Sequence, residues 1–212
     1  MTFTVMIDPG TMPWRDAYRL MIGSIVPRPI AWVSTVSKEG VRNLAPFSFF
    51  TAVAAEPMTI CFSPMRRGTD GARKDTLVNI EETGEFVVNI VSESLAEAMN
   101  RTSAEFPPEV DEFQVAGLTP IASTTVKPPR VGESLVAYEC RLLQVVHVGE
   151  AKAGAGALVL GIVQRLYVAD QALDPDHGRI RLDVLQPIGR MAGMDYLRCT
   201  DRFTVDRPTT GR

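Results

Sequence analysis

The densest group of charged and hydroxyl side chains lies between Arg66 and Thr76, in the sequence Arg-Arg-Gly-Thr-Asp-Gly-Ala-Arg-Lys-Asp-Thr. Four cations, two glycines and two threonines stand there just before a predicted helix. Such a loop can offer backbone N–H groups, hydroxyl donors and positive charge to a phosphate group, and the helix N-terminus adds its dipole. Taken alone, a charge run of this kind is more often a solvated loop, so both interpretations stand at this point.

A second suggestive stretch runs from Arg28 to Phe50. Small polar residues lie there along a predicted hairpin of apolar and aromatic residues, at Ser34, Thr35, Asn43 and Ser48. A flat isoalloxazine ring needs this mixture, because its tricyclic body takes apolar cover while its pyrimidine edge takes a few donors and acceptors. An ordinary barrel hairpin explains the same residues equally well.

Glycines at Gly154, Gly156 and Gly161 suggest a dinucleotide-binding fingerprint. They precede a predicted strand rather than connecting a strand to a helix, so a hairpin turn is the better interpretation. The sequence contains no Walker A pattern either. A nucleotide cofactor would therefore have to be bound by a different motif.

Nucleophile–base chemistry and zinc binding find little support. Neither Ser34 nor Ser48 lies in a GxSxG pattern. His147 is expected in a strand and His177 in a turn. The cysteines are odd in number, far apart and without a CxxC pair, so we expect free thiols in a reducing compartment, with the first two buried; they are Cys61, Cys140 and Cys199.

Composition indicates one globular domain. The chain has 212 residues, of which 45% are hydrophobic and 22% charged, and its net charge is −3. This acidic balance argues against nucleic-acid binding, and acidic residues interleave with the basic ones of the segment Arg179–Arg212. The N-terminus lacks a signal-peptide pattern and no stretch is long enough to span a bilayer, so we expect a cytoplasmic protein without a membrane partner.

Strands dominate the predicted elements, because runs rich in β-branched and aromatic residues recur between turn residues. The predicted strands are Pro29–Val36, Asn43–Ala52, Met58–Phe62, Glu85–Val91, Ser134–Val148 and Ala157–Val168. We expect the first two to pair as a hairpin across Lys38-Glu-Gly40, and Gly149–Gly156 to be the turn between the last two.

Helices are fewer. The stretch Lys74–Gly84 predicts a helix with Asp75 or Thr76 as its N-cap and Gly84 as its C-cap. A second helix is expected over roughly Ser92–Arg101, with Ser94 and Glu97 as a capping box. The proline-rich stretch Pro107–Pro129 is interpreted as an ordered excursion of the same domain. The fold class is therefore mainly β, an antiparallel barrel with peripheral helices.

The stretch Arg28–Phe50 resembles the signature of the flavin reductase-like family, whose fold is an FMN-binding split barrel. This family includes flavoredoxins and the small reductases of two-component monooxygenases. Further similar segments follow in the same order, namely Lys74–Ile80, Glu85–Ile90, Asp111–Leu118, Tyr138–Cys140 and Pro187–Tyr196. The last resembles the family's Arg-x-x-Gly-x-x-Tyr pattern. The resemblance implies one antiparallel Greek-key split-barrel domain over residues 1–212, with a core at about 21–196 and extensions at both ends.

The resemblance also implies where FMN binds. The strand with Ser34 and Thr35 and the strand Asn43–Ser48 would flank the ring, and backbone N–H groups of Asn43–Ala45 are candidate donors to its N1–C2=O edge. The loop entering the predicted helix at Lys74 would take the ribityl phosphate, and Arg190 would reach the cofactor or its surroundings. The implied binding residues are Ser34, Thr35, Asn43, Leu44, Ala45, Pro46, Phe47, Ser48, Arg73, Lys74, Asp75, Thr76 and Arg190, with no metal and no catalytic side chain, since FMN would carry the redox chemistry.

The leading hypothesis is a homodimeric NAD(P)H-dependent reductase of flavin or of another small acceptor, with an electron-accepting protein or a monooxygenase component as a further partner. A nicotinamide needs only to stack on the exposed flavin face, so the missing dinucleotide fingerprint is no objection. One alternative is a flavoredoxin-type electron carrier that a partner protein reduces. Another is a module on the same barrel that binds no flavin, for example a haem-binding module.

Overall fold

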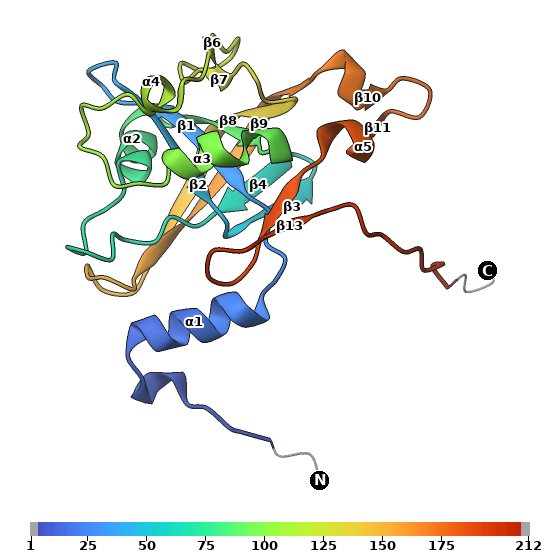
Figure 1. Ribbon diagram of the computed structural model, residues 1–212. Coiled ribbons are helices and arrows are strands. Elements are labelled where there is room, and N and C mark those ends of the chain that lie inside the picture. The colour runs from blue at the N-terminus through green and yellow to red at the C-terminus, as the bar shows by residue number, and fades with distance from the viewer. Residues whose placement is uncertain (1–3, 209–212) are drawn as a thin grey trace.

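A seven-stranded antiparallel sheet forms the body of the protein (Figure 1). The computed structural model describes residues 4–208. The strand order is β2-β1-β5-β8-β9-β4-β3. The bounds are β1 Ala31–Val36, β2 Arg42–Phe47, β3 Phe50–Ala55, β4 Met58–Phe62, β5 Glu85–Ile90, β8 Val136–Val148 and β9 Gly156–Val168. The rings of Phe47 on β2 and Phe62 on β4 lie 5.1 Å apart although β2 and β4 are near opposite ends of this order, so the sheet curls into a barrel.

Short helices and two-stranded ribbons lie around this barrel. The helices are η1 Pro9–Thr11, α1 Trp14–Ser24, α2 Asp75–Thr83, η2 Glu93–Leu95, α3 Ala96–Arg101, α4 Glu112–Ala116, η3 Asp170–Ala172 and α5 Leu182–Leu185. The ribbons pair β6 Pro120–Ile121 with β7 Arg130–Val131, β10 Leu173–Asp174 with β11 Arg179–Ile180, and β12 Ile188–Arg190 with β13 Tyr196–Arg198. None of the helices within residues 4–208 is long and apolar enough to cross a membrane.

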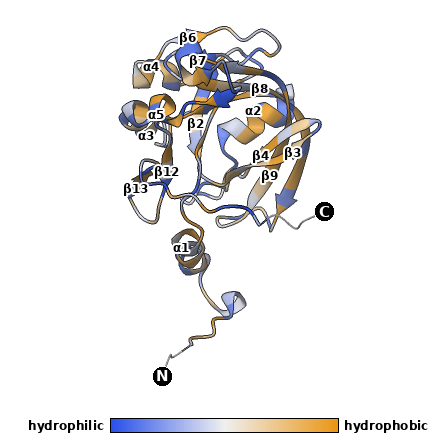
Figure 2. Ribbon diagram, turned by 90° about the vertical axis from the view of Figure 1, so that its right-hand side faces the viewer, coloured by the Kyte–Doolittle hydropathy of each residue, from blue (hydrophilic) through white to orange (hydrophobic). Residues whose placement is uncertain are grey.

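Hydrophobic residues recur along the barrel strands (Figure 2), and most of these strands contribute buried side chains to an apolar core. Phe62 lies between Phe47 and Phe86, with ring centroids 5.1 and 5.6 Å away. Leu77 and Ile80 of α2 pack into the same core, as their i, i+3 spacing predicts. Burying one such side chain contributes about 1.5–3 kcal/mol, so α2 is held against the barrel by its apolar face.

A second core lies on the other face of β1, because side chains alternate across a strand. Trp32 and Leu44 point there and pack with Met99 of α3 and Phe113 of α4. The indole N–H of Trp32 donates to Oγ1 of Thr102 at 2.9 Å, so its polar atom is satisfied although the ring is fully buried. β1 is therefore covered on both faces and forms the rigid centre of the fold.

The predicted hairpin is confirmed, with Ser34 opposite Leu44 and Thr35 opposite Asn43. The predicted strand Asn43–Ala52 was wrong in its extent. The chain leaves β2 after Phe47, turns at Ser48-Phe49, and continues as β3, which pairs with β4 at the other end of the sheet. The apolar run hides this turn, because the residues of β3 are as apolar as those of β2 although most of them are exposed.

The predicted helix caps need correction at one end. Gly84 is the C-cap in the left-handed conformation, with φ of 72°, as predicted. The N-cap is Lys74 rather than Asp75 or Thr76, which lie in the first turn of α2. In the stretch 92–101, η2 and α3 follow one another as expected, but neither begins with a side-chain cap, so the predicted capping box is wrong.

The excursion 107–129 is ordered, and a buried carboxylate holds its second half. Glu139 of β8 accepts hydrogen bonds from the backbone N–H groups of Thr124 and Thr125 at 2.8 and 2.7 Å. Both threonine hydroxyls donate to it as well. Burial alone would raise the pKa of Glu139, but these hydrogen bonds outweigh it and lower the pKa below its usual value. The loop is thus fixed to the barrel by an ionised group.

Within residues 4–208, no group of three or more His, Cys, Asp or Glu side chains is arranged to bind a metal ion. All three cysteines are free thiols: Cys140 is buried, Cys61 half-buried and Cys199 exposed. His147 lies in β8 and His177 in a turn, as predicted.

The helix α1 has no counterpart among the predicted elements. It projects from the barrel and buries none of its residues (Figure 1). Contact is made at its start: Trp14 lies against Gly154 in the β8–β9 turn, and Arg15 donates to the carbonyl oxygen of Gly68 at 3.1 Å. The first turn of α1 is thereby fixed to the tip of the β8–β9 hairpin and to the basic loop before α2.

Gly161 of β9 is expected to tolerate no side chain, since a Cβ there would collide with Cζ of Phe86 and lie 3.3 Å from Cβ of Cys140. Phe86 is fully buried against Phe62 and cannot yield without opening the core. We expect Gly161→Ala to lower the free energy of unfolding by about 1–3 kcal/mol in urea denaturation. Gly23→Ala in exposed α1, where a Cβ meets nothing within 4 Å, should stabilise slightly or not at all. Equal effects of the two substitutions would contradict the prediction.

Candidate functional site

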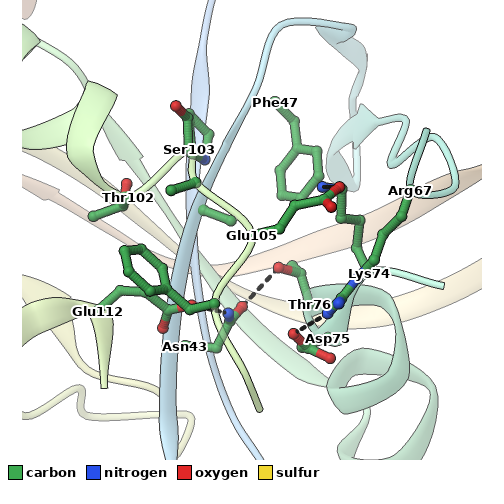
Figure 3. A pocket seen from close by; sticks show the side chains of 14 residues that line it. Asn43, Phe47, Arg67, Lys74, Asp75, Thr76, Thr102, Ser103, Glu105 and Glu112 are labelled. Atoms are coloured by element: carbon green, nitrogen blue, oxygen red, sulfur yellow. Dashed lines mark hydrogen bonds and ion pairs between the residues drawn. The ribbon is translucent and has the colours of Figure 1, made fainter. Parts of the chain in front are cut away.

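A polar pocket lies where β2, the loop before α2 and the segment between α3 and α4 meet (Figure 3). An aromatic cleft adjoins it and reaches α1. The polar pocket is rich in charged and hydroxyl side chains and is lined by Asn43, Ala45, Pro46, Phe47, Arg67, Lys74, Asp75, Thr76, Thr102, Ser103, Ala104, Glu105, Phe106 and Glu112. The aromatic cleft is lined by Tyr18, Pro46, Phe47, Ser48, Phe49, Ser63, Met65, Arg66 and Lys74. The two share Pro46, Phe47 and Lys74, so one elongated ligand could contact both.

Asn43 is the centre of a buried hydrogen-bond network in the polar pocket. Its Oδ1 accepts from the hydroxyls of Thr76 at 2.6 Å and Thr35 at 3.3 Å. Its Nδ2 donates to Oε1 of Glu112 at 2.8 Å. Asn79 of α2 donates in turn to Thr35 at 3.0 Å. The network ties the edge strand β2 to α2 on one side and to α4 on the other.

The N-terminus of α2 opens into the polar pocket without a side-chain cap. The carboxylate of Asp75 is bound by Arg67, and the hydroxyl of Thr76 donates to Asn43, so neither side chain turns back onto the helix end. First-turn N–H groups have no intrahelical partner, and the helix dipole makes them attractive to an anion. Lys74, the N-cap residue, adds a positive charge at the same point.

Carboxylates already face the two cations that line the polar pocket. Arg67 pairs with Asp75 at 2.7 Å, and Nζ of Lys74 lies 3.1 Å from Oε1 of Glu105. Hydrogen bonds from Lys74 and Thr69 lower the pKa of Glu105, which is therefore ionised at neutral pH. An anionic ligand at Lys74 would enter a site whose charges are balanced.

Glu112, the first residue of α4, is a buried carboxyl on the wall of the polar pocket. Besides the Asn43 amide it accepts the backbone N–H of Leu44 at 3.1 Å. Burial, with a smaller contribution from Asp75, raises its pKa to about 7 against the opposing effect of these hydrogen bonds. The Leu44 N–H, a candidate donor to a flavin edge in the sequence analysis, is thus already engaged.

In the aromatic cleft, Tyr18 of α1 and Phe49 after β2 face each other with ring centroids 6.4 Å apart. Phe47 and Met65 complete apolar walls that suit a flat ring. Tyr18 places α1 in the site, although none of the residues of this helix is fully buried.

Arg28 lies buried behind the cleft, with only 4% of its surface exposed. Its guanidinium donates to the carbonyl oxygens of Ile22 and Ile25 at 2.7 and 2.8 Å, at the end of α1. It also donates to the carbonyl oxygen of Met191 at 3.0 Å and to the hydroxyl of Ser48 at 3.3 Å. One side chain therefore joins α1, the cleft and the C-terminal segment.

The structure brings most of the residues inferred from the resemblance to these pockets. Asn43, Ala45, Pro46, Phe47, Lys74, Asp75 and Thr76 line the polar pocket, and Ser48 lines the cleft. Thr35 lies directly behind Asn43. Four others line neither pocket. Ser34 and Leu44 point to the opposite face, Arg73 pairs with Glu81, and Arg190 donates to the Gly193 carbonyl oxygen and stacks on Tyr196.

Sequence reasoning did not assign a role to several side chains that line the pockets. Tyr18 lies on the unpredicted α1, and Glu105 lies on a loop without a recognisable pattern. Glu112 belongs to a segment that carried the family resemblance, but nothing local indicates that it reaches Asn43, 69 residues away. These contacts arise from the fold and have no signature in a short window of sequence.

Comparison with known proteins identifies the family. Residues 22–182 match the model of the flavin reductase like domain, and the chain belongs to this family. It is 42% identical over 205 residues to an uncharacterized protein of Halalkalibacterium halodurans, covering 96% of each chain.

Two solved structures are similar over nearly their whole length. Nitrilotriacetate monooxygenase component B from Bacillus cereus is 40% identical with a TM-score of 0.90, over 97% of this chain and 100% of that one. A 2-nitrobenzoate 2-nitroreductase from Pseudomonas fluorescens is 32% identical with a TM-score of 0.85, over 98% of each. The fold is thus the split barrel of flavin reductases that the sequence resemblance implied.

Glu112→Gln tests the raised pKa of the Asn43 network. Because the pKa is about 7 in the folded protein against a usual value of 4.5, protonation favours folding, fully so below about pH 4.5. This contribution is lost as the pH rises to about 7. The wild type should therefore lose about 2–3 kcal/mol of unfolding free energy relative to Glu112→Gln over this range.

Urea denaturation at a series of pH values measures this difference. Glu109→Gln is the control, since Glu109 is exposed and lines neither pocket; it should keep the wild-type profile. If the difference between wild type and Glu112→Gln did not change between pH 4.5 and 7, the raised pKa would be wrong.

Proposed function

We propose that the protein is an FMN-dependent oxidoreductase that takes electrons from NAD(P)H and delivers them to free flavin or another small acceptor. The observation that carries this proposal is the junction of two complementary pockets at Lys74: an aromatic cleft of the kind a flat ring requires and an uncapped helix N-terminus of the kind a phosphate requires. Bound FMN would supply the redox chemistry, while the protein would bind and orient it.

In this proposal the ring lies in the aromatic cleft. Phe47 and Phe49 cover its apolar body, and Ser48 and Ser63 offer hydroxyl groups. The phosphate lies at the N-terminus of α2, between Lys74 and the first-turn N–H groups. Ser34 and Leu44 then act by holding the strands, and Arg73 and Arg190 support the loop and the C-terminal ribbon that border the site.

The two similar solved structures support two acceptor classes. One is named as a component of a monooxygenase, which suggests that reduced flavin passes to a separate oxygenase. The other is named as a nitroreductase, which suggests direct reduction of a small aromatic acceptor. In both classes the acceptor or the departing flavin must reach an open site, and the polar pocket reaches the surface at the exposed residues Ser103 and Glu105.

A flavoredoxin-type carrier would use the same FMN site but take electrons from a protein. We expect the purified protein to bind added FMN, and NADH or NADPH to bleach the visible flavin absorbance under anaerobic stopped-flow conditions. Binding without bleaching by either nucleotide would favour the carrier. Failure to bind FMN would overturn the flavin proposal and favour a module for another ligand.

We also propose a homodimer. The apolar residues Leu20 and Met21 of α1 and Ile25, which directly follows it, are exposed, and an isolated amphipathic helix of 11 residues has little stability of its own. The edge strand β3 also exposes Val53. Sedimentation equilibrium should give the mass of two chains, and the double substitution Leu20→Glu with Met21→Glu should shift the protein toward monomer. A monomeric wild type at micromolar concentration would contradict the dimer.

The proposed compartment is the cytoplasm. Its support is chemical: all three cysteines are free, and the exposed Cys199 would be open to oxidation outside a reducing environment.

A further inference from the structure

Three of the four cations of the basic loop Arg66–Lys74 are bound to carboxylates. Arg67 pairs with Asp75, Arg73 with Glu81, and Lys74 with Glu105. Arg66 donates to the carbonyl oxygen of Gly71 at 2.8 Å. The loop that offers positive charge to a phosphate is therefore largely neutralised by the protein itself.

Glu105 differs from the other carboxylates in where it comes from. Asp75 and Glu81 lie on α2, whereas Glu105 lies on the segment 102–111 between α3 and α4, on the opposite side of the polar pocket (Figure 3). It connects the middle of the loop to its C-terminal end, because Oε1 lies 3.1 Å from Nζ of Lys74 and Oε2 accepts a hydrogen bond from the hydroxyl of Thr69 at 2.9 Å. It thus uses the cation and hydroxyl that a phosphate oxygen would use.

The electrostatic consequence is direct. Arg67 and Lys74 line the pocket, and their positive charges are balanced by the negative charges of Asp75 and Glu105. A phosphate at Lys74 must either displace Glu105 or lie beside it, and like charges at contact distance repel. Because the side chain of Glu105 is one-third exposed, it can turn into solvent at small cost in ion-pair energy.

We propose that Glu105 competes with the ligand's phosphate for Lys74 and Thr69, and so determines how strongly the site distinguishes FMN from riboflavin. This inference rests on the proposed flavin function and deepens it. Glu105 weakens the hold on FMN and makes it exchange faster, which suits a reductase that releases its flavin to an acceptor. Riboflavin has the same ring but no phosphate, so its affinity does not depend on Glu105.

Fluorescence titration of full-length wild type, Glu105→Gln and Glu109→Gln with FMN and with riboflavin tests this proposal. Glu109→Gln removes the same charge from the same segment outside both pockets. We expect Glu105→Gln to tighten FMN binding about three- to tenfold and to slow its dissociation. Riboflavin affinity should change less than twofold, and Glu109→Gln should leave both affinities unchanged. Unchanged or weaker FMN binding to Glu105→Gln would overturn the proposal, as would a gain shared equally by riboflavin.

Lys74→Ala separates this inference from the function on which it rests. Losing that charge-assisted contact should weaken FMN binding at least fivefold and leave riboflavin nearly unaffected. Lys38→Ala is the control, since Lys38 pairs with Glu82 toward the far end of α2, 3.7 Å away. If Lys74→Ala weakens FMN binding but Glu105→Gln does nothing, the competition is wrong and the phosphate site stands. If no variant or wild type binds FMN, the proposed function itself fails.

Discussion

The side-chain amide of Asn43 holds the site together, because it joins three elements that no backbone ladder connects. Its oxygen accepts from Thr76 on α2 and its nitrogen donates to Glu112 on α4, while its own strand, β2, is an edge strand of the barrel. A buried amide offers two donors and two acceptor positions, so it can satisfy partners of both kinds. Together with the apolar face of α2, this group fixes the position of the α2 N-terminus relative to β2.

The Asn43 network also affects the ionisation of a carboxyl group in the polar pocket. Glu112 lies beside Asn43 and out of water, which makes its carboxyl hard to ionise. The neighbouring Arg42 does not offset this, because it forms a salt bridge with Asp111. Of the three carboxyl groups that line the polar pocket, Glu112 thus titrates near neutrality while Glu105 stays charged. The net charge of the polar pocket therefore depends on the protonation of Glu112 and on the position of the loop that carries Glu105, rather than on an excess of basic residues.

Local patterns predicted the parts of the site that lie close together along the chain. The two strand patterns and the turn between them predicted the hairpin in which Thr35 pairs with Asn43, although not this register, and Gly84 predicted the end of α2. Only the family resemblance linked these parts to a ligand. Contacts between distant segments were beyond both kinds of reasoning: Glu105 is 31 residues from Lys74, and α1 contributes Tyr18 although its sequence shows no strong helix start. Such contacts depend on how loops cross a finished barrel.

The buried charge of Arg28 affects the electrostatic potential in the aromatic cleft. Its buried guanidinium is satisfied by carbonyl and hydroxyl oxygens, and within residues 4–208 no carboxylate lies within 4.0 Å of it. Although burial lowers its pKa, an arginine keeps its proton throughout the physiological range. The cleft beside Ser48 therefore lies in a standing positive potential that neither pH nor loop movement can switch off. In a weakly polarisable interior this field favours whichever redox state of a bound molecule carries the more negative charge.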